Sequence, residues 1–120
     1  MKRPDPSKSV RILAALSLAA GLLVCASAAG AQSDAPMAIA LAEKNLCLSC
    51  HKVETRVVGP AYRDVAARYK GDAGALERLI AKVAKGGKGV WGTVPMPANK
   101  DVSEADIRTI VTWVLSLAPS

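Results

Sequence analysis

The sequence predicts a small all-α domain, and two observations carry that prediction. Two segments repeat apolar residues at positions i, i+3, i+4 and i+7, the spacing that places them on one face of a helix. They are Leu76, Leu79, Ile80 and Val83, and then Ile107, Ile110, Val111 and Val114. No segment gives a convincing strand pattern, and there is no internal repeat. A chain of 120 residues leaves room for one small domain.

The N-terminus, residues 1–31, is predicted to be a secretory signal peptide. Residues 1–11 carry four basic side chains against Asp5, residues 12–29 carry no charge, and Ala29-Gly30-Ala31 offers a small-residue cleavage site. The alternative is an uncleaved membrane anchor, since 18 uncharged residues approach the length of a membrane span. Cleavage after Ala31 would discard Cys25 and leave Cys47 and Cys50 as a pair.

The remaining domain, residues 32–120, has 89 residues and only four aromatic side chains. Such a chain forms a marginal core unaided. Without the first 31 residues it has 12 basic and 9 acidic side chains, a net charge of +3. This mild charge, with no interleaving of aromatic and basic residues, argues against a nucleic-acid partner.

The first two helices are expected on either side of a break. Residues 37–46 are strong helix formers without Gly or Pro, and they lead directly into Cys47. Gly59-Pro60 interrupts the chain, and residues 61–69 form a short amphipathic stretch that Gly71 closes.

The third helix contains Leu76 to Val83 and ends at Gly86-Gly87, a favoured C-terminal signal. Residues 86–100 are rich in Gly and Pro and predict an irregular loop with fixed turns, in which we expect Val90, Trp91 and Val94 to be buried. Ser103 and Asp106 resemble a capping box at the start of the last helix. Trp113 and Leu117 widen the apolar face of that helix.

The chemistry of the chain is concentrated in the pentapeptide Cys47-Leu48-Ser49-Cys50-His51, which has the C-x-x-C-H spacing of haem c attachment. Two thiols three positions apart can form thioethers with the two vinyl groups of one haem. The imidazole of the next residue then becomes an iron ligand. A disulfide or redox dithiol is an alternative, although its usual βαβ setting is missing. A zinc site would need a fourth ligand besides two Cys and one His.

A second axial ligand must come from methionine, because His51 is the only histidine of the chain. Met96 lies between Pro95 and Pro97, and the two prolines restrict the conformations of its loop. Met37 lies near the N-terminal edge of the domain and is interpreted as a terminal or core residue. A methionine more often fills a core than binds a metal, but the proline bracket favours Met96 as the ligand, and Met/His ligation favours an electron carrier.

Five motifs, in this order, resemble the short bacterial class I cytochromes c of the cytochrome c-551/c-552 group. They are CLSCH at 47–51, VGPAY at 58–62, GVWG at 89–92, VPMP at 94–97 and WVL at 113–115. The resemblance implies a class I cytochrome c fold, with about four helices wrapped around one haem that is attached through Cys47 and Cys50. The porphyrin would supply the aromatic core that the sequence lacks. One departure is Ala98, where the family often has a second proline.

The resemblance also implies roles for three further residues. The Pro60 carbonyl would accept the N–H of the proximal imidazole, which orients the ring. The indole of Trp91 would donate to a haem propionate, and Asn99 would lie beside the ligand sulfur. Each has a simpler interpretation: Pro60 as a turn, Trp91 as core, and Asn99 as a cap for the final helix.

The function implied is that of a monomeric periplasmic carrier, not an enzyme, that shuttles single electrons between respiratory complexes or reductases. Its redox partners would be a cytochrome reductase or oxidase, or an acceptor of the nitrite-reductase type. After cleavage of the signal peptide it would not insert stably in a membrane. A gas-binding sensor or a peroxidase would need an open iron site, and a peroxidase would also need distal acid–base groups. We expect four lysines to form a mild positive rim for partner encounter: Lys52, Lys82, Lys85 and Lys88.

Overall fold

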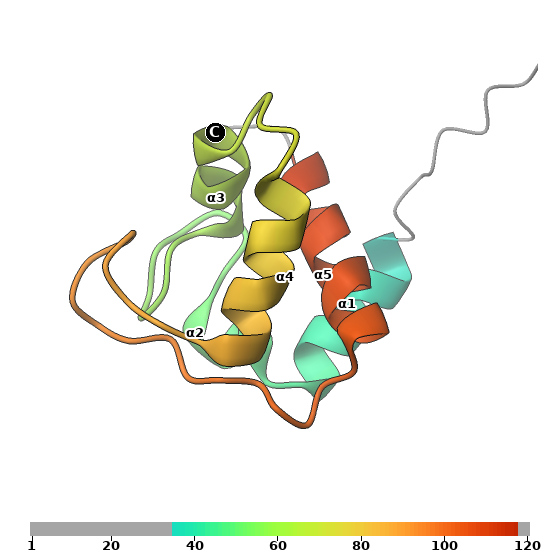
Figure 1. Ribbon diagram of the computed structural model, residues 1–120. Helices are drawn as coiled ribbons and strands as arrows, with labels where there is room; N and C mark the ends of the chain where they lie inside the picture. Colours follow the sequence, from blue (N-terminus) through green and yellow to red (C-terminus); the bar gives the residue numbers. More distant parts are fainter. Residues whose placement is uncertain (1–34, 118–120) are drawn as a thin grey trace, which may run out of the picture.

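The computed structural model describes residues 35–117 (Figure 1). The predicted signal peptide, residues 1–31, therefore lies outside the described residues. Within 35–117 the chain forms five α-helices and no strand. They are α1 (Ala35–Lys44), α2 (Cys47–Cys50), α3 (Tyr62–Arg68), α4 (Ala75–Lys85) and α5 (Glu104–Ser116). The predicted all-α class is confirmed, and the fifth helix is the single turn α2, which the sequence did not separate from the helix before it.

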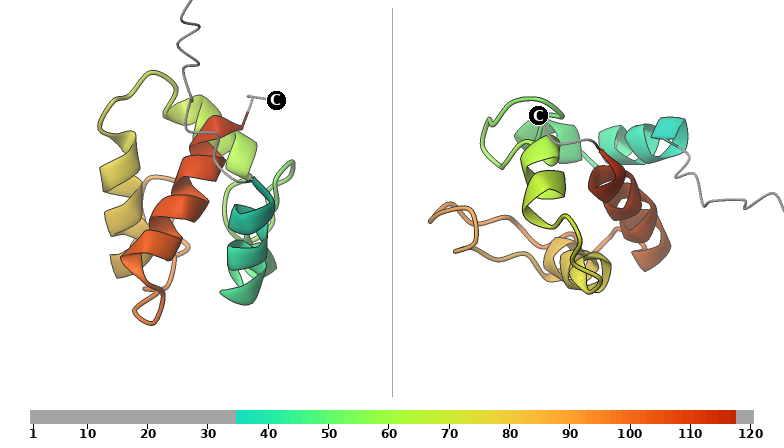
Figure 2. Two further views of the ribbon diagram at one scale, coloured as in Figure 1. Left: turned by 90° about the vertical axis from the view of Figure 1, so that its right-hand side faces the viewer. Right: turned by 90° about the horizontal axis from the view of Figure 1, so that it is seen from above.

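Helix α5 is the centre of the arrangement, since α1, α3 and α4 all contact it. Figure 2 shows α4 and α5 side by side, with α1 on the other side of α5. The helix begins where the sequence predicts, because the Ser103 hydroxyl accepts a hydrogen bond of 3.1 Å from the backbone N–H of Asp106. Its predicted apolar face is confirmed by five buried residues: Ile107, Ile110, Val111, Trp113 and Val114.

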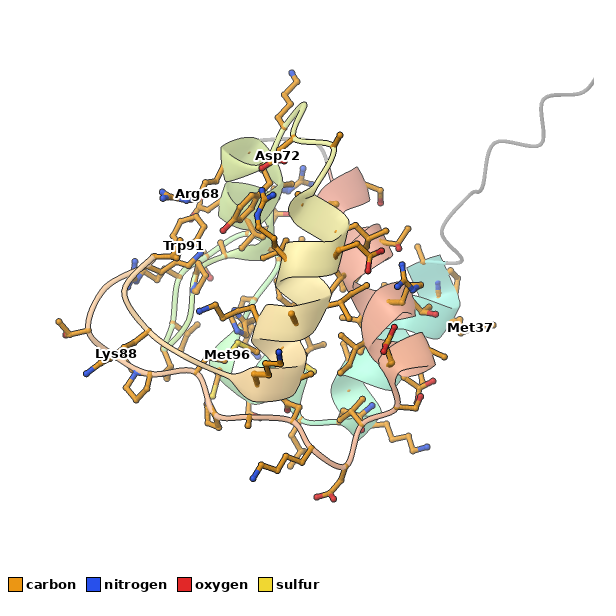
Figure 3. The ribbon with its side chains drawn as sticks, in the orientation of Figure 1. Met37, Arg68, Asp72, Lys88, Trp91 and Met96 are labelled. Carbon is orange, nitrogen blue, oxygen red and sulfur yellow. The ribbon has the colours of Figure 1, made fainter. Side chains whose placement is uncertain are left out.

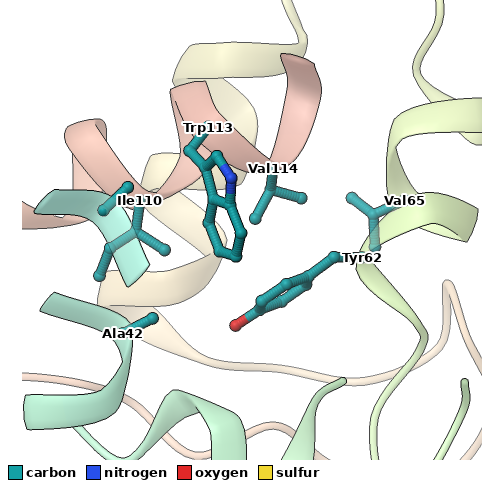
Figure 4. Packing of buried hydrophobic residues seen from close by; sticks show 7 residues of the cluster. Ala42, Tyr62, Val65, Ile110, Trp113 and Val114 are labelled. Carbon is teal, nitrogen blue, oxygen red and sulfur yellow. The ribbon is translucent and has the colours of Figure 1, made fainter. Parts of the chain in front are cut away.

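Two aromatic residues form the middle of the larger core cluster (Figure 4). Tyr62 from α3 meets Trp113 from α5 edge to face, with ring centroids 5.5 Å apart. Ala38 and Ala42 of α1 belong to the same cluster and are fully buried. Their small side chains let α1 approach α5 closely.

Helix α4 packs less deeply than its apolar pattern suggests. Ile80 is buried, whereas Leu76, Leu79 and Val83 are half-buried. Leu79 and Val83 pack against the core on one side and border a cleft on the other. On the outside, Arg108 of α5 binds Glu77 of α4 through two N–O contacts of 2.6 and 3.0 Å.

The chain between α1 and α2 corrects the expectation of a helix over residues 37–46. Helix α1 ends at Lys44, and Leu46 adopts the left-handed conformation, with φ 59° and ψ 17°. A left-handed residue ends a right-handed helix, so α2 starts afresh at Cys47 with a different direction.

The loop between α4 and α5 gives the second correction. Val90 and Val94 were expected to be buried, but they are 42% and 60% exposed, and Trp91 is half-buried. The loop runs along the cleft. Within the described chain, no helix packs over its two valines far enough to bury them. Among residues 35–117, antiparallel pairing is limited to one isolated bridge, between Gly87 and Met96.

Residues 35–117 include no helix with the length and apolar character needed to cross a membrane.

Candidate functional site

A cleft of about 170 Å³ brings together most of the residues that the sequence singles out. It lies among α2, α3, α4, α5 and the loop of residues 87–97, and its lining is largely apolar. The predicted site residues on its wall are Cys47, Cys50, His51, Pro60, Trp91 and Met96. Asn99 is the one predicted site residue outside that lining.

The single turn of α2 presents both cysteines to this cleft. The backbone N–H of His51 donates to the carbonyl of Cys47, 3.0 Å away, and closes the turn. Both thiols are free and half-buried. Burial is the main cause that raises the pKa of the Cys47 thiol above its ordinary value, and the neighbouring Cys50 adds to it.

The imidazole of His51 is held in one orientation by its neighbours. Its Nδ1 atom lies 2.8 Å from the carbonyl oxygen of Pro60, the contact that the resemblance implies. A carbonyl only accepts, so Nδ1 carries the proton, and Nε2 is left as the nitrogen that can bind a metal. The turn that supplies this carbonyl is tied back to α2, because the N–H of Gly59 donates to the Cys50 carbonyl at 2.8 Å.

Gly59 is a site residue that the sequence analysis did not single out. A Cβ atom at this position would lie 2.4 Å from Cε1 and 2.8 Å from Nε2 of His51. Any side chain would therefore displace the imidazole. From the sequence, this glycine is interpreted as a chain break and as part of the motif VGPAY, with no role at the imidazole.

Tyr62 is a second residue that sequence reasoning missed. Its ring stacks on the His51 imidazole, with centroids 5.2 Å apart and 18° between the planes. Because Trp113 packs edge to face on the same tyrosine ring, the imidazole is supported from the protein core. Burial raises the pKa of Tyr62 well above its ordinary value, so the phenol stays neutral at all physiological pH.

Met96 and Met37 occupy opposite parts of the molecule (Figure 3). Met96 is half-buried and lines the cleft, whereas Met37 on α1 is 53% exposed and is not part of the lining. The Met96 backbone is paired with Gly87, since each N–H donates to the other's carbonyl, at 2.8 and 3.0 Å. Of the two methionines in the described chain, only Met96 can supply a thioether to this cleft.

Two arginines that the sequence analysis did not name contact Trp91, one at its ring and one at its backbone carbonyl. The guanidinium of Arg68 lies 5.1 Å from the centroid of the Trp91 ring. Arg56 donates to the Trp91 carbonyl at 2.8 Å. Figure 3 shows Arg68 and Trp91 next to each other at one end of the loop. Both arginines lie far from Trp91 in the sequence, and neither belongs to a motif. A search for local motifs therefore does not find these contacts.

Asn99 lies where the loop returns to α4. Its side-chain amide donates to the carbonyls of Val83, at 3.0 Å, and Pro97, at 3.3 Å. Its backbone N–H also donates to Val83, at 3.2 Å. The final helix takes its cap from Ser103. The described contacts of Asn99 thus tie the loop to α4.

The alternatives to haem attachment find no support in the geometry. Cys47 and Cys50 are not joined in a disulfide. Among residues 35–117 no group of three or more His, Cys, Asp and Glu side chains could hold a metal ion together. A zinc site built on the pentapeptide thus has no fourth ligand in this part of the chain.

The residues present fit a haem group. Two thiols three positions apart, an imidazole with Nε2 available and a methionine thioether line one apolar cleft. Because Gly59 has no side chain, the His51 imidazole has room beside it. This donor set matches the covalent and axial chemistry of a c-type haem.

Comparison with known proteins agrees with this site. The family model described as cytochrome c matches residues 39–118. A cytochrome c-551 from Allochromatium vinosum is 57% identical over 90 residues, which cover 72% of this chain and 96% of the relative. A cytochrome c-552 from Nitrosomonas europaea is 45% identical over 101 residues, which cover 84% of this chain and 92% of the relative.

Solved structures agree as well. The crystal structure of wild-type Nitrosomonas europaea cytochrome c552 superposes with a TM-score of 0.64 at 48% identity, covering 66% of this chain and 98% of that one. The class 1 cytochrome MtoD from Sideroxydans lithotrophicus gives a TM-score of 0.59 at 34% identity, covering 69% and 95%. The chain belongs to the cytochrome c family. It has the class I fold and carries one covalently bound haem c, with Cys47 and Cys50 at the attachment positions.

Proposed function

We propose that this protein is a periplasmic monohaem electron carrier whose iron is held by His51 and Met96. The observation that carries the proposal is that the Pro60-bound imidazole and the Met96 thioether line the same cleft. A haem with this ligand pair takes up and releases single electrons at a raised reduction potential. The chain's own part is to orient the imidazole, to hold the thioether on the loop between α4 and α5 and to surround both with apolar side chains.

The fixed imidazole suits electron transfer. Iron ligands that keep their positions when the oxidation state changes keep the reorganisation energy of electron transfer small. Hydrogen bonding to Pro60 and stacking on Tyr62 restrain the ring. A gas sensor or a peroxidase would instead need a sixth position that opens to an outside ligand. The proline-bracketed Met96 favours the closed arrangement.

Partner encounter is proposed to occur at the mouth of the cleft. Val58 and Val94 line the cleft and are each at least half exposed, and Lys88 and Arg56 line the same cleft. An apolar patch with cations beside it suits a redox protein that carries acidic side chains around its own docking site. We propose that this partner is a cytochrome reductase or oxidase, or an acceptor of the nitrite-reductase type, and that the protein meets it as a monomer.

Optical spectra of the haem-loaded protein test the ligand pair. Methionine bound to ferric iron gives a weak near-infrared charge-transfer band. Met96→Ala should lose this band, become high-spin or water-ligated, and have a much lower reduction potential. Met37→Ala is the matched control, because that methionine is exposed and lies outside the cleft. A Met96→Ala protein with wild-type band and potential would show that Met96 is not the ligand.

Export is tested separately. Expression of the full chain should yield, in the periplasmic fraction, a polypeptide that begins at Gln32 and carries the added mass of one haem. Intact-mass measurement checks both statements at once. A membrane-bound product that retains residues 1–31 would establish the anchor instead.

A further inference from the structure

The C-terminal end of α4 is in direct contact with the backbone of the Met96 loop. Helix α4 ends at Gly86, which has φ 71° and ψ −165°. A Cβ atom on Gly86 would lie 2.5 Å from the Met96 carbonyl oxygen, 2.8 Å from the Ala98 nitrogen and 2.9 Å from the Pro97 carbonyl carbon. All three are backbone atoms, so no side-chain rotation could relieve the overlap.

The same short segment is fixed on both sides of this contact. Gly87 exchanges two backbone hydrogen bonds with Met96, at 2.8 and 3.0 Å. Asn99 donates from its backbone and its side chain to the Val83 carbonyl, at 3.2 and 3.0 Å. Residues 96–99 therefore lie along the last turn of α4. The prolines at 95 and 97 leave the loop few other backbone conformations.

We propose that Gly86 is a positioning residue for the Met96 thioether: the missing side chain lets the ligand loop rest on the end of α4, and this contact sets the distance of the sulfur from the cleft wall. The inference rests on the proposed ligand role of Met96. Any side chain at Gly86 must push the backbone of residues 96–98 away from α4, and the Met96 side chain moves with it.

Gly71 provides a matched control for this effect. It also has a left-handed φ, 78°, close to the 71° of Gly86. A Cβ atom at Gly71, however, would meet nothing within 4 Å. Alanine costs backbone strain at both positions, and the cost at Gly86 includes its ψ of −165°, in a region that essentially only glycine adopts. Only at Gly86 does alanine also press on the ligand loop.

The experiment compares Gly86→Ala with Gly71→Ala in the haem-loaded protein. Gly71→Ala should lower the midpoint of unfolding and leave the near-infrared band and the reduction potential at their wild-type values. Gly86→Ala should weaken or abolish the band and lower the potential while the helical content persists. A folded Gly86→Ala protein with wild-type band and potential overturns the proposal, and so does an equal loss of the band in Gly71→Ala.

Two further variants keep the outcome decisive. In a Met96→Ala background, adding Gly86→Ala should not change the potential further, because no thioether remains to be displaced. If Met96→Ala alone retained the band, the ligand assignment would fail and the role of Gly86 would fail with it. Loss of the band in Met96→Ala together with a wild-type band in Gly86→Ala would overturn the role of Gly86 alone. If Gly86→Ala yields no folded protein, Asn99→Ala replaces it: the band should then disappear at a lower temperature than in wild type, with a smaller shift in helix melting. An unchanged temperature for loss of the band overturns the proposal.

Discussion

The guanidinium of Arg68 stands 5.1 Å from the centre of the Trp91 ring, and this contact joins the last turn of α3 to the loop that carries Met96. The two residues are far apart in the sequence. Arg56 adds a hydrogen bond of 2.8 Å to the Trp91 carbonyl. Together the two arginines hold the end of the loop that is distant from α4.

Arg68→Ala should destabilise the protein by about 0.5–1 kcal/mol, the usual size of an exposed cation–π contact. The loss should be seen as a lower denaturant midpoint with an unchanged slope. Arg68→Lys should recover part of it, because an ammonium also interacts with the ring but lacks the planar shape of the guanidinium. Lys70→Ala removes a nearby exposed cation and should have no effect. Equal midpoints for Arg68→Ala and Lys70→Ala would mean that the ring contact contributes nothing.

Leu46→Gly should stabilise the protein by up to about 1 kcal/mol. Leu46 has a left-handed φ of 59°, a conformation that costs an L-residue about 1–2 kcal/mol. Its side chain is 74% exposed, so little burial is lost with it. The extra flexibility of glycine in the unfolded chain offsets part of the gain. Leu46→Ala keeps the strain and serves as the control: if it stabilised the protein as much as glycine does, relief of strain would not be the cause.

Folding should depend on the attached haem. Leu79 and Val83 line the cleft and are half-buried, so these apolar residues gain full burial only with the haem in place. The double variant Cys47→Ala with Cys50→Ala should therefore be largely unfolded or degraded in the cell. Circular dichroism of the purified polypeptide checks this. Native helicity with a cooperative thermal transition in the double variant would contradict the prediction.

Charge reversal on the lysine rim should slow electron transfer to the partner. Lys88 lines the cleft and Lys85 is exposed in the last turn of α4. The variant with Lys85→Glu and Lys88→Glu should transfer electrons more slowly at low salt, and the difference should vanish as salt screens the charges. Lys44→Glu with Lys70→Glu changes the net charge equally but lies outside the cleft lining. Equal slowing in both double variants would point to net charge alone, and no slowing in the first would place docking on the apolar patch.

The ion pair between α4 and α5 should make a pH-dependent contribution to stability. Hydrogen bonding to Arg108 holds the pKa of the Glu77 carboxyl below its ordinary value of 4.5. A carboxyl with a lowered folded-state pKa stabilises the fold above pH 4.5, and this stabilisation is lost as the pH falls through the folded-state value.

The measurement is chemical unfolding of Glu77→Gln at several pH values. The variant should be slightly less stable than wild type at pH 7, since exposed pairs contribute little, and the gap should close in acid. Glu43→Gln on α1 is the control, with no expected difference at either pH. A gap of constant size from pH 7 to pH 3 would exclude the ionised pair as its source.

The sequence by itself determined the helical class, the start of α5 at Ser103 and the pentapeptide that carries the haem. These features are local: helical periodicity, a capping residue and two thiols three positions apart depend on neighbours within a few residues. The bracketed Met96 could be selected over Met37 for the same reason, since its prolines are adjacent to it.

Only the tertiary structure decided what surrounds these residues. The approach of Gly59 to the imidazole, the stacking of Tyr62 on His51 and the contact of Gly86 with the Met96 backbone all join segments that are separate in the sequence. It also placed Val90 and Val94 on an exposed cleft wall, because the loop follows a cleft that the other helices leave open. Periodicity reports which face of a helix is apolar; whether that face meets protein or a cofactor cleft depends on how distant segments pack.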